Sequence, residues 1–512
     1  MGDTEREIER TYESPGRDAA LPDLTGAGGV AAVLPQGVVE RDAVHYDTAD
    51  LRLAAASLTL CRRPGGGAPG WRLELPVPAA AGARDGIGMP LSDTVPAELA
   101  ALVRSRTRDA ELIPVLRLRS SRDTTRLFDA KNALAAEVSV DTVRARRLGA
   151  GGSTAEWTEV GVARGPGAGP ALLDAVEKRL RRAGLRRTAP APTAVRALAR
   201  TRTATGEPVV GEPAAAVAVS AGDHVLAYLR EQADAVVAHD PGVRRGLPDS
   251  VHQMRVATRR LRSAFRTYRA FLDRSVTDPV AGELKWLAAE LGVDRDHEVL
   301  SRRLRTRIDA LPADLLLGPV RARLRSWESV RRAGARERTL AVLDSGRYLA
   351  LLDALDALLA EPPLRPAAGA PARQALPGRV RKVHARLAGR VGRALALPPG
   401  RERDLALHHA RKAAKRARYA AEAARPALGR PAGRFAERMK AVQTLLGDHQ
   451  DSVVAREALR ELALQAHAAG ESAFTWGLLH GEEAARAERL ERELPRLWSK
   501  ASARKLRAAL DG

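Results

Sequence analysis

The sequence predicts a multidomain protein of the α+β class, with an N-terminal antiparallel β-barrel followed by an all-α domain. Three observations support this prediction. Residues 1–205 contain short segments that alternate apolar and polar side chains, the later residues are rich in Ala, Leu and Arg at helical spacing, and one helical motif occurs twice. A chain of 512 residues is long enough for two or three domains.

The first half of the chain shows the two-residue period of β-strands. Four segments have this pattern: residues 56–63 (ASLTLCRR), 71–75 (WRLEL), 115–119 (VLRLR) and 135–143 (AAEVSVDTV). Successive side chains of a strand point to opposite faces, so each segment gives one apolar and one charged face. The Gly/Pro cluster at 64–70 (PGGGAPG) suits a hairpin loop. These features favour an antiparallel barrel.

The second half of the chain is expected to be helical. Residues 206–216 (GEPVVGEPAAA) have the composition of a linker, and long helices are expected from about 217 to 512. A second break, the Pro/Ala/Gly-rich segment 361–378, divides this half. The expected repeat halves are therefore about 217–360 and 379–512.

An internal repeat supports this division. VHQMRVATRRLR (251–262) matches LHHARKAAKRAR (407–418) at an offset of 156 residues. Downstream, LKWLAAELGVDRD (284–296) matches MKAVQTLLGDHQD (439–451) at an offset of 155. We therefore expect two copies of one helical unit, related by a pseudo-two-fold axis.

Each copy carries a basic stripe along one helix face, because its members recur every three or four residues. The stripe residues of the first copy are His252, Arg255, Arg259, Arg262 and Arg266. Those of the second are His408, Arg411, Lys415 and Arg418. Like charges at this spacing repel one another, so the stripes make most sense where a linear polyanion supplies the missing charge. The alternative is a solvated basic face in an arginine-rich protein, and the matched recurrence argues against it.

Other matched residues leave alternatives open. No clustered His or carboxylate spacing accompanies His252, which favours a phosphate-contacting or structural imidazole over a metal ligand. Asp296 and Asp451 either cap a following helix or pair with a stripe arginine. The Leu-Gly before each aspartate is expected to end a helix.

Composition narrows the classes of partner. A net charge of +22 and a pI near 11.0 attract polyanions: nucleic acid, anionic membrane or polyphosphate. Aromatic residues make up only 3%, which counts against stacking on single-stranded nucleic acid but leaves duplex phosphate contacts open. Cys61 is the single cysteine, so no internal disulfide is expected. With neither an apolar leader nor a run of about 18 apolar residues, the expected compartment is the cytoplasm.

The paired helical motifs resemble the CHAD family, the conserved-histidine α-helical domains that bind polyphosphate. HQMRVATRRLR, HHARKAAKRAR, LGVDRD and LGDHQD carry the resemblance, which covers about 217–512. It implies two four-helix bundles facing each other across a basic groove, with no cofactor. The residues at positions that would line the groove are the two stripes together with the matched lysines Lys285 and Lys440.

The N-terminal half resembles the CYTH domain, the triphosphate tunnel fold often fused to CHAD. EIER near the start, YDTADLRLAAASLTL (46–60), WRLELP (71–76) and EVSVDTV (137–143) carry this resemblance. Such families hydrolyse triphosphates or cyclise ATP. The resemblance therefore implies Mg or Mn held by glutamates, with phosphates gripped by lysines and arginines.

The sequence departs from the CYTH pattern in one direction. Six residues stand where the CYTH pattern has a cation or an acid: Thr11, Cys61, Glu74, Gly161, Ala163 and Ala194. The phosphate-binding candidates that remain are Arg63, Arg117 and Arg119. The metal-binding candidates that remain are Glu7, Glu9, Glu137, Asp141 and Glu159. A weak metal-phosphate site could survive, but losing several charge-assisted contacts favours an inactive or severely weakened barrel.

Three functions follow from these patterns. The leading one is a polyphosphate-binding protein, which the family resemblance places at polyphosphate granules. The alternative is a metal-dependent inorganic triphosphatase or polyphosphate-processing enzyme, acting on tripolyphosphate or a nucleoside triphosphate that the helical half recruits. Nucleic-acid binding is the third, and it rests on the net charge alone.

Overall fold

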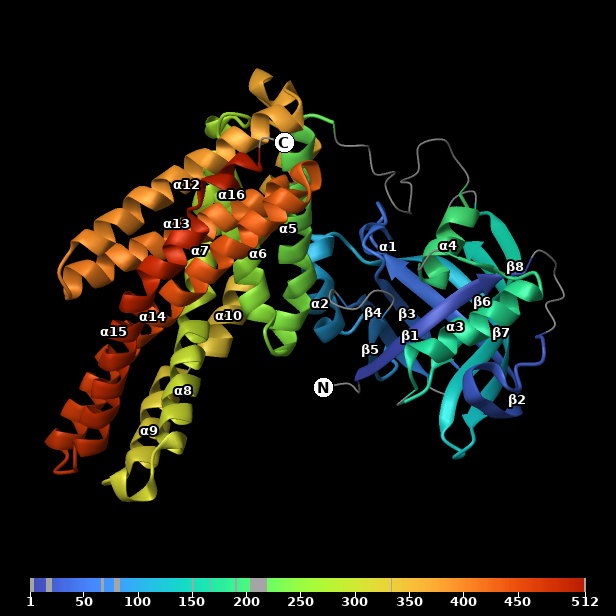
Figure 1. Cartoon of the computed structure of the whole chain (residues 1–512). Helices are drawn as coiled ribbons and strands as arrows, with labels where there is room; N and C mark the ends of the chain where they lie inside the picture. The colour runs from blue at the N-terminus through green and yellow to red at the C-terminus, as the bar shows by residue number, and fades with distance from the viewer. Residues whose placement is uncertain are drawn as a thin grey trace. The chain divides into compact units, whose positions relative to one another are not determined.

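The computed structural model describes residues 4–14, 21–65, 69–77, 83–149, 152–166, 168–188, 191–202, 219–332 and 334–510. The chain divides into two compact units, residues 1–215 and 216–512 (Figure 1). The linker expected at 206–216 lies outside the described residues. No helix in the described ranges combines the length and the apolar character needed to cross a membrane.

The first unit is built on one antiparallel sheet. Its strands are β1 (Thr4–Glu13), β2 (Val30–Asp47), β3 (Thr59–Arg63), β4 (Gly70–Pro76), β5 (Ala83–Met89), β6 (Ile113–Asp129), β7 (Leu134–Arg147), β8 (Thr154–Arg164) and β9 (Arg186–Arg187). Their order is β5-β4-β3-β2-β6-β7-β8-β1-β9. Because β1 also pairs with β5, the pairings return to their starting strand, as in a barrel. The predicted antiparallel architecture is confirmed.

Short helices pack against this sheet (Figure 1). They are α1 (Arg52–Ala55), α2 (Ala97–Thr107), α3 (Pro170–Arg182) and α4 (Thr193–Arg200), and a 3-10 turn, η1 (Ala27–Gly29), precedes β2. Trp71 and Leu73 of β4 share a buried cluster with Val103 of α2. By alternation, the intervening Arg72 and Glu74 point to the inner face. On β4 the apolar face therefore points outward and the charged face inward. On β6 and β7 the inner face is mixed, because Leu116, Leu118, Val143 and Ala145 pack there against α4.

The second unit is entirely helical in its described part (Figure 1). Its first half contains α5 (Ala221–Arg245), α6 (Ser250–Thr267), α7 (Arg274–Glu290), α8 (Gly292–Ala310), α9 (Val320–Arg332), α10 (Ala335–Leu343) and α11 (Gly346–Ala360). Its second half contains α12 (Ala372–Ala396), α13 (Arg401–Leu428), α14 (Arg430–Ala468), α15 (Phe474–Ala501) and α16 (Arg504–Ala508). The 3-10 turns η2 (Ala313–Leu315) and η3 (Pro366–Gly369) complete it.

The two copies of the repeated motif lie on α6 and α13, which pack against each other. Met254 and Leu261 of α6 share one buried cluster with Ala417 and Ala421 of α13. Small alanine side chains allow two helices to approach closely, so the repeat is joined by a common core. A separate cluster, which includes Trp327 and Trp476, joins α8 and α9 to parts of α14 and α15.

One expected helix end is wrong. The sequence predicts that a helix stops at Leu446–Gly447, but α14 continues through this point. Gly447 is buried, and a Cβ there would lie 3.4 Å from the Arg411 guanidinium. This glycine therefore lies inside the helix, against an arginine, rather than at the end of the helix. In the first copy the expectation holds, because α7 ends at Glu290 and α8 begins at Gly292.

Candidate functional sites

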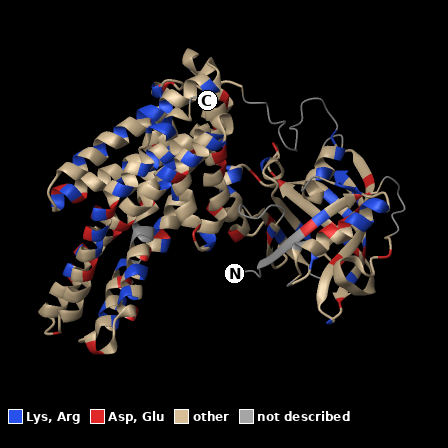
Figure 2. Ribbon diagram, viewed as in Figure 1, with Lys and Arg blue, Asp and Glu red and all other residues tan. Residues whose placement is uncertain are grey.

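The predicted basic stripes lie on α6 and α13 as half-buried side chains, with Arg266 more exposed. Met254 and Phe265 are buried on the opposite face of α6, so this helix is amphipathic with a cationic outer side. Figure 2 shows Lys and Arg on many turns of the helices in this unit.

The two stripes meet around Lys415 on α13. Burial, together with Arg411, Arg259 and then Arg418, lowers the pKa of Lys415 to about 7, and Asp451 opposes this effect. Arg259 is the first-copy counterpart of Lys415, so the structure brings both stripes into one cationic cluster. A bound anion would favour the charged form of this lysine.

Two further stripe arginines have matching environments. Arg255 lies against Gly292, to whose carbonyl oxygen its Nη1 donates a hydrogen bond at 3.3 Å, and Arg411 lies against Gly447. A Cβ on Gly292 would lie 3.1 Å from Arg255, tighter than most real contacts. The glycines of the two LG motifs thus each lie against one stripe arginine, and at Gly292 an added side chain would crowd it.

Several polar atoms of the stripes are buried without a hydrogen-bond partner in the described part of the chain. They are Nε of Arg259, Nε of Arg411 and Nδ1 of His408. Burial, followed by Lys412, lowers the pKa of His408, so this imidazole is neutral near pH 7. Buried polar atoms normally have partners, so these atoms suit a ligand that supplies acceptor oxygens.

The structure does not bring every predicted helical residue into this cluster. Lys285 and Lys440 are exposed, and no hydrogen bond or ion pair within the described residues joins them to the stripes. Asp451 lies inside α14, so it caps no helix, and its carboxylate is 4.0 Å from Arg411, which fits the pairing alternative. The side chain of Asp296 lies outside the described residues.

The sequence reasoning missed a third basic stripe, on α12. Arg379, Lys382, Arg386 and Arg390 are spaced by three and four residues, and three of them line a hollow with Arg266 and Arg416. The spacing rule applied to 251–266 would have found this stripe in RVRKVHARLAGR. It was missed because α12 lies outside the repeated motif.

One group in the described residues has the spacing to hold a metal ion: Asp404, His449 and Glu491. His449 Nε2 is 3.1 Å from Glu491 and 3.4 Å from Asp404. However, Arg456 pairs with Asp404 and Arg403 pairs with Glu491, each at 3.0 Å. Both carboxylates already have cationic partners, so this group is better explained as an internal ion network joining α13, α14 and α15.

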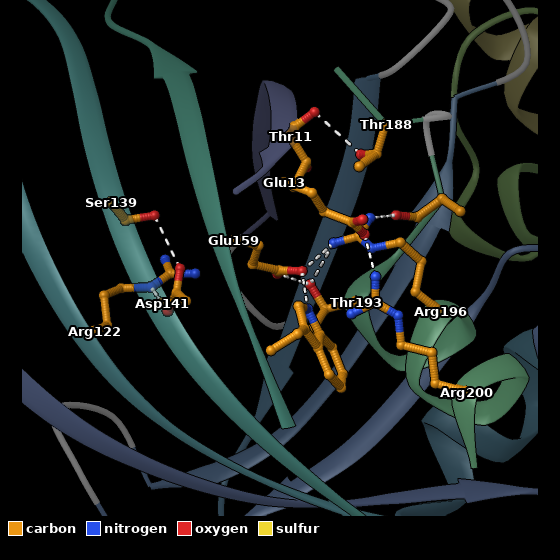
Figure 3. Close-up of polar contacts among 12 residues, drawn as sticks. Thr11, Glu13, Arg122, Ser139, Asp141, Glu159, Thr188, Thr193, Arg196 and Arg200 are labelled. Atoms are coloured by element: carbon orange, nitrogen blue, oxygen red, sulfur yellow. Dashed lines mark hydrogen bonds and ion pairs between the residues drawn. The ribbon is translucent and has the colours of Figure 1, made fainter. Parts of the chain in front are cut away.

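In the barrel, Glu159 is fully engaged by neighbouring side chains (Figure 3). Its carboxylate accepts hydrogen bonds from Arg196 at 2.5 Å, Thr193 at 2.7 Å and Trp157 at 2.9 Å. Burial tends to raise the pKa of Glu159, but Arg196 and the other donors hold it below its ordinary value. Arg196 and Thr193 belong to α4, so this helix occupies the oxygens that a metal would need.

The other inner-face acids are also paired. Asp141, which is 3% exposed, accepts hydrogen bonds from Arg122 at 2.6 Å and Ser139 at 3.1 Å (Figure 3). Glu137 pairs with Arg126 at 3.2 Å. Arg122 also interacts electrostatically with Glu9 and Glu159. These candidates therefore share one inner face, as metal-binding candidates would, but with guanidinium groups among them. The side chain of Glu7 lies outside the described residues.

The predicted phosphate-binding arginines of the barrel do not lie together. Arg117 and Arg119 alternate with Leu116 and Leu118 and fall on the face opposite Arg122. There they pair with Asp42, at 2.5 Å and 3.3 Å. They therefore do not meet the candidate metal ligands, which corrects the grouping expected from sequence.

Arg63 does remain on the inner face, where it interacts electrostatically with Glu74. The sequence reasoning missed the other inner arginines: Arg41, Arg72, Arg84, Arg122 and Arg126. Extending the alternation along all 17 residues of β6 would have identified two of them. Burial tends to raise the pKa of Glu74, yet Arg84, Arg72 and Arg63 lower it below the ordinary value.

Comparison with known proteins places these sites in context. The CHAD domain family matches residues 227–460, within the helical unit. Two Mycobacterium tuberculosis proteins match nearly the whole chain: "Uncharacterized protein MT2285" of strain CDC 1551 / Oshkosh and "Uncharacterized protein Rv2226" of strain ATCC 25618 / H37Rv. Each is 37% identical over 507 residues, which cover 95% of this chain and 94% of the relative.

Similarity to solved structures is weak. PptA from Streptomyces chartreusis has a TM-score of 0.47 and 23% identity, covering 55% of this chain and 99% of its own. The PH1819 protein from Pyrococcus horikoshii OT3 has a TM-score of 0.23 and 13% identity, covering 38% and 99%. Likeness at this level carries no weight for function.

Proposed function

This chain belongs to the family of the two M. tuberculosis proteins and carries a CHAD domain, and from this premise we propose that it binds inorganic polyphosphate. The proposed site is the pair of basic stripes on α6 and α13. Residence in the cytoplasm at polyphosphate granules belongs to the same proposal.

The cationic cluster around Lys415 is the observation that carries this proposal. Arg259, Arg411 and Arg418 all act on Lys415, and Asp451 opposes them. Arg418 also pairs with Glu422 at 3.1 Å. Like charges held together in a partly buried place cost folding free energy unless an anion neutralises them. A linear polyanion can contact both stripes at once, and each charge-assisted hydrogen bond adds to its affinity.

Binding to long-chain polyphosphate tests the proposal directly. The full chain is titrated with polyphosphate at physiological salt, with RNA as competitor at equal phosphate concentration. We expect tight binding that falls with added salt and that RNA does not displace. Ready displacement by RNA would instead reduce the stripes to general electrostatic attraction. Failure to bind polyphosphate at all would overturn the proposal.

For the N-terminal unit we propose a structural or regulatory role without hydrolysis, in a barrel related to CYTH domains. Support comes from Glu159, Asp141 and Glu137, whose carboxylates are paired with arginines. Mg or Mn would have to displace these guanidinium groups, so the residues present do not fit a divalent metal. The alternative, a metal-dependent triphosphatase acting on tripolyphosphate or a nucleoside triphosphate, needs those same oxygens free.

A further inference from the structure

The hollow between the C-terminal end of α6, α12 and α13 is lined almost entirely by cations. Apart from Thr267 and Val383, its lining residues are Arg266, Arg269, Arg379, Lys382, Arg386 and Arg416. Within the described part of the chain none of these six cations makes an ion pair. Burial, followed by Arg266, Arg390 and Arg386, lowers the pKa of Arg416 to about 10. The hollow therefore concentrates positive charge without a described carboxylate to balance it.

The internal repeat provides a comparison for this hollow. The counterpart of Arg416 in the first copy is Arg260, and the counterpart of Arg266 in the second copy is Glu422. Arg260 pairs with Glu422 at 3.2 Å, whereas Arg416 faces Arg266. One end of the α6–α13 contact thus contains its own carboxylate. At the other end an arginine stands in the position of that carboxylate.

The hollow also offers a polar atom that lacks a partner. Thr267 is 8% exposed, and its Oγ1 is buried without a hydrogen-bond partner in the described part of the chain. Because Thr267 lines the hollow, its hydroxyl is available to an oxygen bound there. A ligand with several anionic oxygens would satisfy both this hydroxyl and the arginines.

We infer that this hollow binds a phosphate group, either as free orthophosphate or as one phosphoryl unit of a polyphosphate chain. A tetrahedral oxyanion suits it because planar guanidinium groups approach phosphate oxygens with two donors each. This phosphate hollow is distinct from the Lys415 cluster: apart from Arg266, its lining residues lie outside the two stripes. The inference therefore goes beyond the proposed function and stands on different residues.

The test compares variants of the full chain with orthophosphate and, separately, long-chain polyphosphate as the probes. The R386Q/R416Q double variant removes two cations of the hollow and leaves the two polyphosphate-binding stripes on α6 and α13 intact. R266E places a carboxylate where the other copy has Glu422. We expect each variant to weaken orthophosphate binding at least about tenfold. We expect R266E to melt no lower than the wild type, because Arg416 gains a partner.

The matched control is R260Q, which alters the equivalent arginine at the end that already contains a carboxylate. It should leave orthophosphate affinity unchanged. A variant altered only in the Lys415 cluster should also keep orthophosphate binding, which separates failure of this inference from failure of the proposed function. If R386Q/R416Q weakens only polyphosphate binding, the group bound in the hollow is a phosphoryl unit of polyphosphate rather than free orthophosphate. Unchanged affinity for both probes in R386Q/R416Q, or an equal loss in R260Q, would overturn the inference.

Discussion

In the barrel, Arg122 lies 2.6 Å from Asp141, and Arg196 lies 2.5 Å from Glu159. In the helical unit, Lys415 lies among three arginines, and Asp451 is the carboxylate that opposes them. Both regions concentrate arginine, but in the barrel Asp141 and Glu159 lie at hydrogen-bond distance from arginines. In the helical cluster Lys415 and Arg259 make no ion pair within the described residues, Arg411 is 4.0 Å from Asp451, and Arg418 alone has a close carboxylate partner, Glu422. A paired interior gains little from an added anion or metal, because binding either one breaks existing contacts. The helical cluster has more cations than carboxylates, so it gains from an anion that reaches it. The number of arginines thus says less about binding than the number of their partners.

Charge reversal in the helical cluster should have the largest effect. The R259E/R411E/K415E variant is expected to weaken polyphosphate binding by about a thousandfold or more, because it removes several charge-assisted contacts and adds repulsion. Fluorescence titration at fixed salt measures the change. The control R489E/R496E/K500E makes the same charge change at exposed positions of α15. If both variants lose affinity equally, net charge rather than the cluster governs binding.

Breaking a buried ion pair tests how much the paired interior of the barrel contributes to stability. R196Q leaves the Glu159 carboxylate buried without its cation and should lower the free energy of unfolding by about 3 kcal/mol. R126Q breaks the more exposed pair with Glu137 and should cost below about 1 kcal/mol. Denaturant titration of the barrel transition measures both. Equal effects of the two substitutions would show that pairing of Glu159 contributes no special stability.

The lowered pKa of Lys415 predicts that the helical cluster responds to pH. Since the folded pKa of about 7 lies below the ordinary value of 10.5, the unfolded chain binds the extra proton between these values. Stability without ligand should therefore rise as pH increases through this window. Polyphosphate favours the charged lysine, so its affinity should fall above pH 7, by up to about tenfold per pH unit.

K415R is the matched variant for this pH dependence, because arginine stays charged throughout the range. Binding titrations from pH 6.5 to 8.5 should show a flatter profile for K415R than for the wild type. His408, whose pKa is lowered by burial, is present in both proteins, so it does not account for a difference between them. Identical profiles for the two proteins would remove Lys415 as the titrating group.

The smallest expected effect is in hydrolysis. Because the described inner acids are paired with arginines, phosphate release from tripolyphosphate with Mg or Mn should not exceed that of an E9Q/E159Q variant. A colorimetric phosphate assay on the full chain measures it. Turnover that is present in the wild type and lost in E9Q/E159Q would restore the enzymatic alternative and break the comparison between the two regions.

The sequence predicted the elements that depend on local periodicity and repetition. The antiparallel sheet, the helical second unit and the shared face of Arg255, Arg259 and Arg262 follow from spacings of two, three and four residues. What it did not predict depends on partners far along the chain. Asp141 and Arg122 are 19 residues apart, and Glu159 and Arg196 are 37 apart, so only strand register and the placement of α4 reveal their pairing.

Two errors have local causes that could have been avoided. Arg117 and Arg119 were named as phosphate-binding candidates from the alternation of five residues, whereas the whole strand places them on the face opposite Arg122. Gly447 was interpreted as a helix end because glycine often has that role, whereas here it lies inside α14 with its backbone against Arg411.

The common core of α6 and α13 has a consequence for how the helical unit folds. Met254 and Leu261 from one copy are buried together with Ala417 and Ala421 from the other, although about 160 residues separate them along the chain. Neither copy can lose its structure without exposing the apolar side of its partner to water. The two copies of the motif should therefore unfold in one cooperative transition. A fragment with a single copy should aggregate through the uncovered apolar face of α6 rather than bind polyphosphate on its own.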